Sequence, residues 1–250
     1  MSPVAVLARK EAGELILSVR GIAWLLAMAV ALSVFGLLLV GSTELSLLDN
    51  AQVVYDMAGI VTALGALLGV VVGNDSIGGE RERGSLMPLL LTPISRAGLV
   101  IGKIGGLVVA WMLMFAISIP YFWAVGSTGQ NLIDGVIGVA LLGTPVVLSF
   151  GLFAMGLAAR LESSRSSLIT VLITLLVSGS PLLLGPSLRQ SAIGRVFDAI
   201  NPFSAAVNAF DAVIIDSQPI VAQMARIALT VAWLAIAIWF AFTGVRRLAK

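Results

Sequence analysis

The sequence contains six apolar segments, each long enough for a helix to cross a lipid bilayer. An α-helix rises about 1.5 Å per residue, so about 20 residues span a hydrocarbon core of roughly 30 Å. Hydrophobic residues make up 59% of the chain and charged residues only 11%, whereas a soluble domain has about 25% charged residues. The sequence therefore predicts an all-α integral membrane protein with a single domain over residues 1–250. We expect its six transmembrane helices at residues 22–42, 53–73, 98–125, 132–158, 166–185 and 224–244.

The basic residues are unevenly distributed between the two sides of these segments. Of the 15 Lys and Arg residues, only Arg189, Arg195 and Arg226 fall on the side opposite to both termini. Cytoplasmic loops of membrane proteins carry an excess of Lys and Arg. The bias therefore predicts that both termini lie in the cytoplasm, and that the chain is a multi-pass protein of the cytoplasmic (inner) membrane with the lipid bilayer around it.

A charged stretch and a short leucine-rich run follow the second apolar segment. Residues 80–83, Glu-Arg-Glu-Arg, cannot lie in hydrocarbon at a tolerable free energy, so we expect them to project into water. Gly84 permits a turn, and Ser85 is a good N-cap for a short helix over residues 85–91, which must end before Pro93. An apolar helix held in water is expected to bind the groove of a partner protein. The alternative is a leucine cluster that lies on the membrane surface.

This loop contains, in order, the pattern Glu80-x-Glu82-x-Gly84-Ser85-x5-Leu91-x-Pro93-Ile94-Ser95-Arg96 and then Gly102-Lys103. The pattern resembles the first cytoplasmic loop of type-2 ATP-binding-cassette (ABC) transporter permeases, whose short coupling helix docks on the ATPase subunit. Pro88 departs from it, since many members have a helix former there. The resemblance implies that Glu80 and Glu82 orient the loop through salt bridges to the partner or to the N-terminal helix; otherwise they only keep it soluble. It assigns ATPase coupling to Glu80, Glu82, Gly84, Ser85, Leu86, Leu89, Leu90, Leu91 and Pro93.

The resemblance extends over almost the whole chain and implies the transmembrane permease subunit of an ABC exporter. Such a permease pairs with a second copy or a sister permease, and two ATPase subunits that bind ATP and Mg²⁺ drive it. The chain has no GxxxxGK[ST] loop, which ATP hydrolysis would require. We therefore expect no enzyme activity and no bound cofactor in this chain. Closure of the ATPase dimer would move the second and third helices as a lever.

Residues 1–20 and 191–216 lie outside the six segments and have a helical periodicity of their own. In residues 1–20 the apolar side chains recur at helical spacing, with Arg9, Lys10 and Glu14 largely on other faces. This pattern predicts an amphipathic helix at the membrane surface, which by the resemblance also touches the ATPase and otherwise is a simple anchor. Residues 191–216 predict two short amphipathic helices on the outer surface, separated at Asn201-Pro202.

Several residues inside the apolar segments are candidates for cavity lining or close packing. Gly143-Thr144-Pro145 interrupts the fourth segment, and an interrupted helix either lines a cavity or forms an ordinary kink. Gly65 and Gly69 form a GxxxG motif that permits close approach of another helix, although glycine is common in membrane helices. Lys103, near the inner end of the third segment, is expected to snorkel towards water. Our candidate cavity residues are Ser118, Tyr121, Thr144 and Ser149.

The composition excludes several classes of function. The chain contains no cysteine and no histidine, which excludes disulfides, thiolate or imidazole metal sites and histidine-based catalysis. We expect no metal site, and no nucleic-acid partner because no nucleic-acid-binding motif is present. A secondary transporter usually carries a charge near the membrane midplane, and the sequence shows none. That class, and a membrane scaffold or assembly factor without transport, are the alternatives to an ABC permease.

Overall fold

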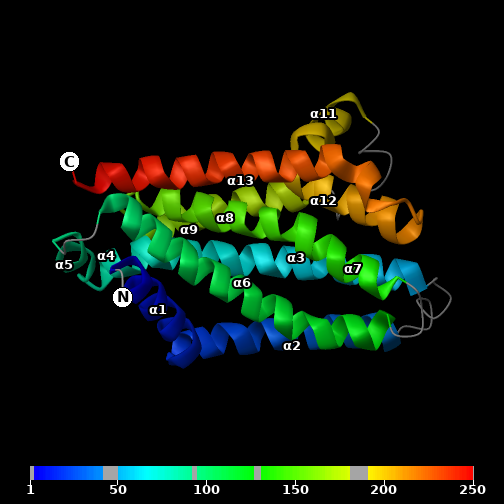
Figure 1. Ribbon diagram of the computed structural model, residues 1–250, viewed down its shortest axis with the longest axis horizontal. Coiled ribbons are helices and arrows are strands. Elements are labelled where there is room, and N and C mark those ends of the chain that lie inside the picture. Colours follow the sequence, from blue (N-terminus) through cyan, green and yellow to red (C-terminus); the bar gives the residue numbers. More distant parts are fainter. Residues whose placement is uncertain (1–2, 42–49, 92–94, 127–130, 181–190, 250) are drawn as a thin grey trace.

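The computed structural model describes residues 3–41, 50–91, 95–126, 131–180 and 191–249, and all regular structure among them is helical. Figure 1 shows the long helices side by side, with the two chain ends at the same end of the bundle as α5. The prediction of an all-α membrane protein is confirmed, because five of the described helices are long and apolar enough to cross a membrane. These candidate spans are Gly21–Leu39, Ala51–Glu82, Arg96–Gly126, Leu132–Ala158 and Ile220–Leu248.

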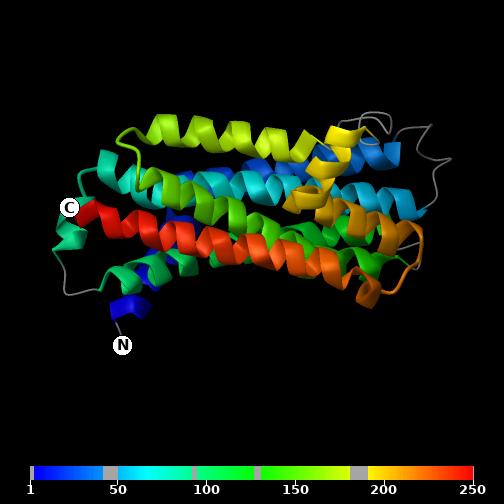
Figure 2. The same cartoon turned by 90° about the horizontal axis from the view of Figure 1, so that it is seen from above.

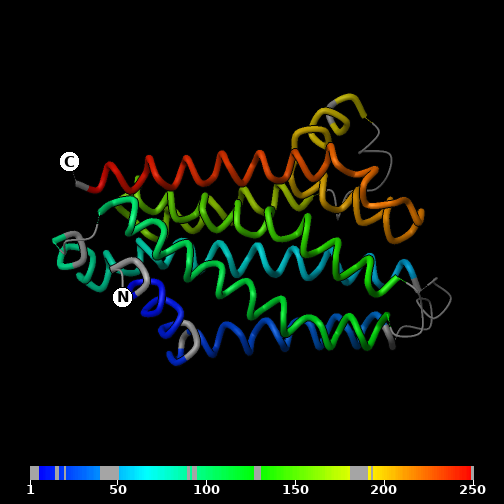
Figure 3. The backbone as a smooth tube through the Cα atoms, viewed as in Figure 1, coloured from blue at the N-terminus to red at the C-terminus, as the bar shows by residue number. Residues whose placement is uncertain are grey.

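Each candidate span consists of one long helix or of several helical pieces in succession. The second joins α3 (Asn50–Asn74), the π-helical turn η2 (Asp75–Gly79) and α4 (Glu80–Glu82). The fourth joins α7 (Leu132–Gly138), the π-helical turn η3 (Val139–Gly143) and α8 (Thr144–Ala158). The others lie on α2 (Val19–Gly41), on α6 (Arg96–Gly126), and on α13 (Met224–Val245) with its flanking 3₁₀ turns η6 (Ile220–Gln223) and η7 (Arg246–Ala249). Figure 3 shows α6 crossing the bundle obliquely, from near α13 at one end to α2 at the other.

Two predicted segments differ from the observed helices. The fifth, residues 166–185, corresponds to α9 (Ser164–Gly179), which lies along one edge of the bundle in Figure 2. This helix is apolar but shorter than the candidate spans, and residues 181–185 lie outside the described residues. At the predicted interruption, residues 143–145, the helix is continuous: the π turn η3 ends at Gly143 and α8 begins at Thr144. Pro145 lies in the first turn of α8, where a missing N–H costs little.

The centre of the bundle is a close contact between α3 and α8. A methyl group on Gly69 would lie 2.9 Å from the Val147 carbonyl oxygen, and one on Gly73 would overlap the Gly151 carbonyl oxygen. The two backbones can approach this closely only because these positions of α3 lack side chains. The close approach predicted from the GxxxG motif is therefore present at Gly69, and it extends one turn further to Gly73.

We expect the variant Gly73→Ala to lower the free energy of unfolding by about 1–3 kcal/mol, because overpacking forces the two helices apart. The added methyl group meets the backbone of α8, which cannot rotate away as a flexible side chain would. The free energy of unfolding in mixed SDS micelles measures the loss. The control is Gly13→Ala on α1, where nothing lies within 4 Å of the new methyl group. Equal losses in both variants would contradict the packing role of Gly73.

The N-terminal helix α1 (Pro3–Leu17) packs against α6 through a mixed apolar and charged face. Leu7 is buried over Gly102, and Glu11 lies against Gly106 one turn further along α6. The Oγ of Ser18 accepts a hydrogen bond from the Gly21 N–H at 3.0 Å and so starts α2 after α1 ends. The predicted N-terminal helix is thus present, but its contact with α6 includes a carboxylate that the periodicity of apolar residues does not reveal.

The two short helices predicted between the fifth and sixth segments are present at the end opposite to the termini (Figure 1). α11 (Ala192–Ile200) is largely exposed, whereas α12 (Pro202–Phe210) is buried against α13 and α9 and continues into the π turn η5 (Asp211–Ile215). Asn201 caps α12 by accepting the Phe203 N–H at 3.0 Å, and its Nδ2 donates to a carbonyl oxygen of α9 at 2.7 Å. α12 is thus buried in the bundle instead of lying on its surface, and the extracytoplasmic position of both helices stays a prediction.

Candidate functional site

The leucine-rich helix α5 (Leu86–Leu90) stands outside the bundle at the end that holds both termini (Figure 1). It follows α4 through a turn at Gly84, whose φ of 71° lies in the left-handed region that favours glycine. The Ser85 N–H donates to the Glu80 carbonyl oxygen at 3.0 Å, and the Ser85 hydroxyl donates to the same oxygen at 3.3 Å. The structure therefore contains both the turn and the short helix that the sequence predicts.

α5 presents part of its apolar surface to solvent and buries the rest. Met87 and Leu91 are 70% and 86% exposed, whereas Leu86 is only 6% exposed. The resemblance assigns Leu86 to a partner, but this side chain packs within the chain and is not available for docking. The side chains of Leu89 and Leu90 and the whole of Pro93 lie outside the described residues. Among the described side chains, Met87 and Leu91 are thus the apolar surface offered to a partner.

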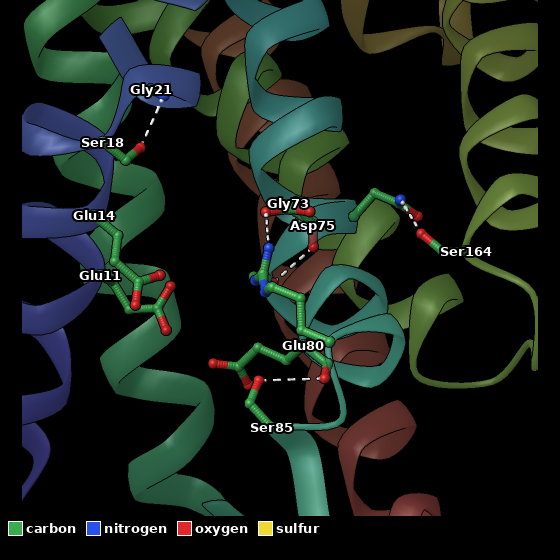
Figure 4. Close-up of polar contacts among 12 residues, drawn as sticks. Glu11, Glu14, Ser18, Gly21, Gly73, Asp75, Glu80, Ser85 and Ser164 are labelled. Carbon is green, nitrogen blue, oxygen red and sulfur yellow. Dashed lines mark hydrogen bonds and ion pairs between the residues drawn. The ribbon is translucent and has the colours of Figure 1, made fainter.

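Charged side chains from α1, α4 and α6 meet beside this helix in an ion cluster, defined as Lys10, Glu11, Glu14, Glu80 and Lys103. Lys103, 1% exposed, donates to Glu11 Oε1 at 2.9 Å and lies 3.1 Å from Glu80 Oε2. The other oxygen of Glu80 accepts from Lys10 Nζ at 3.4 Å, and Lys10 Nζ also lies 3.4 Å from Glu14 Oε1. Figure 4 shows Glu11 and Glu14 on α1 facing Glu80 across a gap.

This cluster corrects two expectations from the sequence. Glu80, expected to project into water, is 3% exposed, and Lys103, expected to snorkel towards water, is buried as well. Burial of an isolated charge is costly, but opposite charges from two other helices offset the desolvation here. Glu80 orients α4 through an ion pair to the N-terminal helix, which is one of the two partners that the resemblance implies. Glu82, by contrast, is exposed.

The surroundings of the ion cluster shift the pKa of two of its members, Glu11 and Lys10. Burial raises the pKa of the Glu11 carboxyl, and the Lys103 ammonium opposes that rise. Partial burial acts to lower the pKa of Lys10, but Glu80 and Glu14 together raise it above its usual value. Glu80 Oε2 faces Lys103 without hydrogen-bond geometry, so it has no hydrogen-bond partner among the described residues. The cluster formally holds three carboxylates and two ammonium groups.

Arg81 fastens the same helix end to α8. Its Nη1 donates to the carbonyl oxygens of Ala158 and Leu161, at 2.9 and 2.5 Å. The last carbonyl groups of a helix lack partners within the helix, and a cation beside them is favourable. Arg83 is exposed instead and pairs with Asp75 at 3.3 Å. The base of α5 is therefore held by α1, α6 and α8 at once.

A cavity of about 610 Å³ opens beside the ion cluster, between α1 and α2 on one side and α3, η2 and α9 on another. This volume lies in the range of about 300–1,000 Å³ that small-molecule sites occupy. Its acidic lining residues are Glu11, Glu14, Asp75, Glu80 and Glu82, and its basic ones are Arg83, Lys103 and Arg165. Apolar side chains, among them Trp24 and Leu107, form other parts of the wall.

None of the four candidate cavity residues lines this cavity. Ser118 and Ser149 are buried, and each hydroxyl donates to a carbonyl oxygen one turn earlier in its own helix, at 2.7 and 2.6 Å. The Tyr121 hydroxyl donates to a carbonyl oxygen of α2 at 3.1 Å, and Thr144 Oγ1 accepts from Trp111 Nε1 at 2.9 Å. The hydrogen bonds of Tyr121 and Thr144 join helices within the chain, and those of Ser118 and Ser149 stay within their own helices. A role of the four residues in another cavity stays a prediction.

Besides Met87, three residues of this site are absent from the assignment made on the sequence: Glu11, Arg81 and Lys103. A signal existed for Lys103, which lies in the third apolar segment, where an ionisable residue usually has a partner. No local pattern identifies the contacts of the other two. Glu11 pairs with a residue 92 positions away, and Arg81 with one 77 positions away.

Comparison with known proteins gives one match that covers nearly the whole chain. The sequence model of a family described as ABC-2 family transporter protein matches residues 5–248. Among curated proteins, no sequence matches. The matched residues include α4, α5, α6 and the part of α1 that carries the ion cluster, so the family match and the site coincide.

Proposed function

Because this chain belongs to the ABC-2 family of transporter proteins, we propose that it is the transmembrane permease subunit of an ABC exporter. The match confirms the predicted family, and five membrane-length helices agree with a multi-pass membrane protein. ATP and Mg²⁺ bind to a separate ATPase subunit, whose groove receives α5. The observation that carries this proposal is an apolar helix outside the bundle with Met87 and Leu91 exposed.

The attachment of α5 is suited to transmitting a movement of the ATPase to the membrane helices. A displacement of α5 passes through the turn at Gly84 to α4, and from Glu80 to both α1 and α6. Arg81 links the same point to α8. The π turn η2 lies between α4 and α3, and such turns are frequent at functional sites. In this proposal, closure of the ATPase dimer moves α3 and α6 as rigid bodies and changes access across the membrane.

In the proposed arrangement both termini and α5 lie in the cytoplasm, and the chain sits in the cytoplasmic membrane. Both termini share one end of the bundle with α5, and most of the basic residues belong to that end, which supports this orientation. Exposed Arg9 on α1 remains available to the ATPase. The permease pairs with a second copy or a sister permease, which is supported by the largely exposed apolar span at Gly21–Leu39.

Replacing Met87 and Leu91 together by glutamate is expected to lower the amount of ATPase retained at least about tenfold, because desolvated apolar anchors dominate such interfaces. Both side chains are exposed, so the double variant removes docking surface without disturbing the bundle. The tagged permease is purified from its native membranes. The co-purifying ATPase is then quantified by mass spectrometry and by ATP hydrolysis.

The control is Val196→Glu on α11, which makes the same apolar-to-acidic change on a 64% exposed side chain at the opposite end of the bundle. This variant is expected to retain the ATPase. Leu86→Glu is unsuitable, since a buried side chain would be lost along with the docking surface. A wild-type preparation that contains no ATPase, or full retention by the double variant, would contradict the proposed function.

A further inference from the structure

The cavity beside the ion cluster is richer in acidic than in basic side chains. Five carboxylate residues and three basic residues line it. The carboxylates come from different elements: Figure 4 shows Glu11 and Glu14 on α1, with Glu80 and Asp75 on the opposite side of the view. Lys103 forms ion pairs with both Glu11 and Glu80, and Arg83 forms an ion pair with Asp75. Lys10 pairs with Glu80 and Glu14 from outside the lining, so five carboxylates face four cations, and the cavity keeps a formal surplus of one negative charge.

Two buried oxygen atoms of the lining residues accept no hydrogen bond among the described residues, although one of them, Glu80 Oε2, lies 3.1 Å from the Lys103 ammonium. Glu80, 3% exposed, has no hydrogen bond to its Oε2, and Asn74, 5% exposed, has none to its Oδ1, among the described residues. The amide group of Asn74 is already engaged, donating to the Ser164 hydroxyl at 3.0 Å. Buried polar atoms are rarely left without partners in native structures. Glu80 Oε2 is compensated by Lys103, whereas Asn74 Oδ1 calls for an N–H or O–H group and so indicates a ligand that donates hydrogen bonds.

The rest of the wall is apolar and includes an aromatic ring. Trp24 from α2, Leu107 from α6 and Leu168 from α9 line the cavity together with the acidic groups. An indole ring attracts a cation through its electron-rich face and also packs against hydrocarbon. A ligand that matches this wall therefore combines an apolar body with a positively charged end.

We propose that this cavity receives the transported substrate and that the substrate is an amphipathic organic cation. Its ammonium or guanidinium group donates to Asn74 Oδ1 and stands among the carboxylates, and its apolar body lies against Trp24 and Leu107. This inference rests on the proposed function, since it names the substrate class of the same permease. A free lipophilic amine and a lipid with an amine headgroup share this chemistry.

The test is a binding measurement on the purified permease alone, in phosphatidylcholine nanodiscs without ATPase or nucleotide. The probe is N-dansyl-1,12-diaminododecane, which has a free primary ammonium at one end, and its N-acetylated analogue is the neutral control. Energy transfer from tryptophan to the dansyl group reports binding, and the variant Trp24→Phe identifies the part that arises in this cavity. The wild-type protein is expected to bind the cation at least about tenfold more tightly than the neutral analogue, as a charge-assisted hydrogen bond predicts.

Two variants separate the charge of the cavity from the integrity of the fold. Glu80→Gln is expected to abolish the preference for the cation, and Glu82→Gln, on an exposed lining residue outside the ion cluster, to reduce it several-fold. Asp216→Asn, at the opposite end of the bundle, is the control and is expected to keep the wild-type preference. Size-exclusion profiles show which variants remain folded. If Glu80→Gln does not fold, the affinities measured for Glu82→Gln still test the proposal.

The outcomes distinguish an aminolipid from a free amine as the ligand, and they separate failure of the substrate class from failure of the proposed function. Competition by phosphatidylethanolamine in the nanodisc indicates an aminolipid substrate, and lack of competition indicates a free amine. Equal affinity for the cation and the neutral analogue would overturn the assignment of substrate class, even if the protein purifies with an ATPase. A cation preference in a protein that never associates with an ATPase would leave the binding site intact and overturn the proposed function instead.

Discussion

Replacing Lys103 by methionine is expected to lower the free energy of unfolding by about 3–5 kcal/mol, the usual cost of breaking a buried ion pair from one side. Lys103 is 1% exposed and its ammonium group lies 2.9 Å from Glu11 and 3.1 Å from Glu80. Without it, two carboxylates remain in a poorly hydrated site with one partly exposed lysine between them. Unfolding in mixed SDS micelles, followed by tryptophan fluorescence, measures the loss.

Lys10→Met is the matched control for this prediction. Lys10 contacts Glu80 and Glu14 at 3.4 Å, but its side chain is 46% exposed, so water screens both pairs and the expected loss is less than about 1 kcal/mol. Adding Glu11→Gln to the Lys103→Met protein removes one uncompensated carboxylate and is expected to recover part of the stability. Equal losses in the two lysine variants, or no recovery in the double variant, would show that burial of the ion cluster does not matter.

Replacing Trp111 by alanine is expected to lower the free energy of unfolding by about 3–5 kcal/mol, as for other fully buried large side chains. Trp111 is 1% exposed and stacks on Phe115 with ring centroids 5.6 Å apart. Its Nε1 donates to Thr144 Oγ1 at 2.9 Å, and its ring fills the space that Gly65 leaves open on α3. The substitution therefore leaves a cavity between α3, α6 and α8, and Thr144 Oγ1 loses its hydrogen-bond donor.

Trp123→Ala provides the comparison, because Trp123 lies on the same helix and is 66% exposed. Its removal leaves no internal cavity, and we expect a loss well below that of Trp111→Ala. Unfolding free energies in mixed SDS micelles again give the measurement, with emission at the remaining tryptophans as the signal. If the two substitutions cost the same, the core around Trp111 does not hold α3, α6 and α8 together.

The parts of the site that depend only on residues adjacent in the sequence could be predicted without the structure. The short helix α5 is bounded on one side by Gly84, where a positive φ ends α4, and the predicted turn and helix are both found. The acidic stem, the leucine run and the following Pro-Ile-Ser-Arg step indicated the family, which the match over residues 5–248 confirms. These signals are local, because a few consecutive residues determine a turn or a short helix.

The exposure of individual site residues could not be predicted in the same way. Leu86 and Met87 are adjacent and similar in hydrophobicity, yet one is buried in the chain and the other is 70% exposed. α11 and α12 both carry apolar residues at helical spacing, but only α12 enters the bundle, where Asn201 anchors it to α9. In each pair the difference depends on which helices are nearby in space, and apolar periodicity does not contain that information.

By itself, the amino-acid sequence determined that this chain is helical, membrane-embedded and a member of a transporter family with a protruding apolar helix. Hydrophobicity, turn preference and charge bias are properties of short segments, so they can be read without coordinates. Only the tertiary structure decided that Glu80 and Lys103 are buried together, that Glu11 joins them, and that an acidic cavity lies beside them. A buried charge is tolerable only when an opposite charge compensates its lost hydration, and here that charge comes from distant parts of the chain brought together by folding.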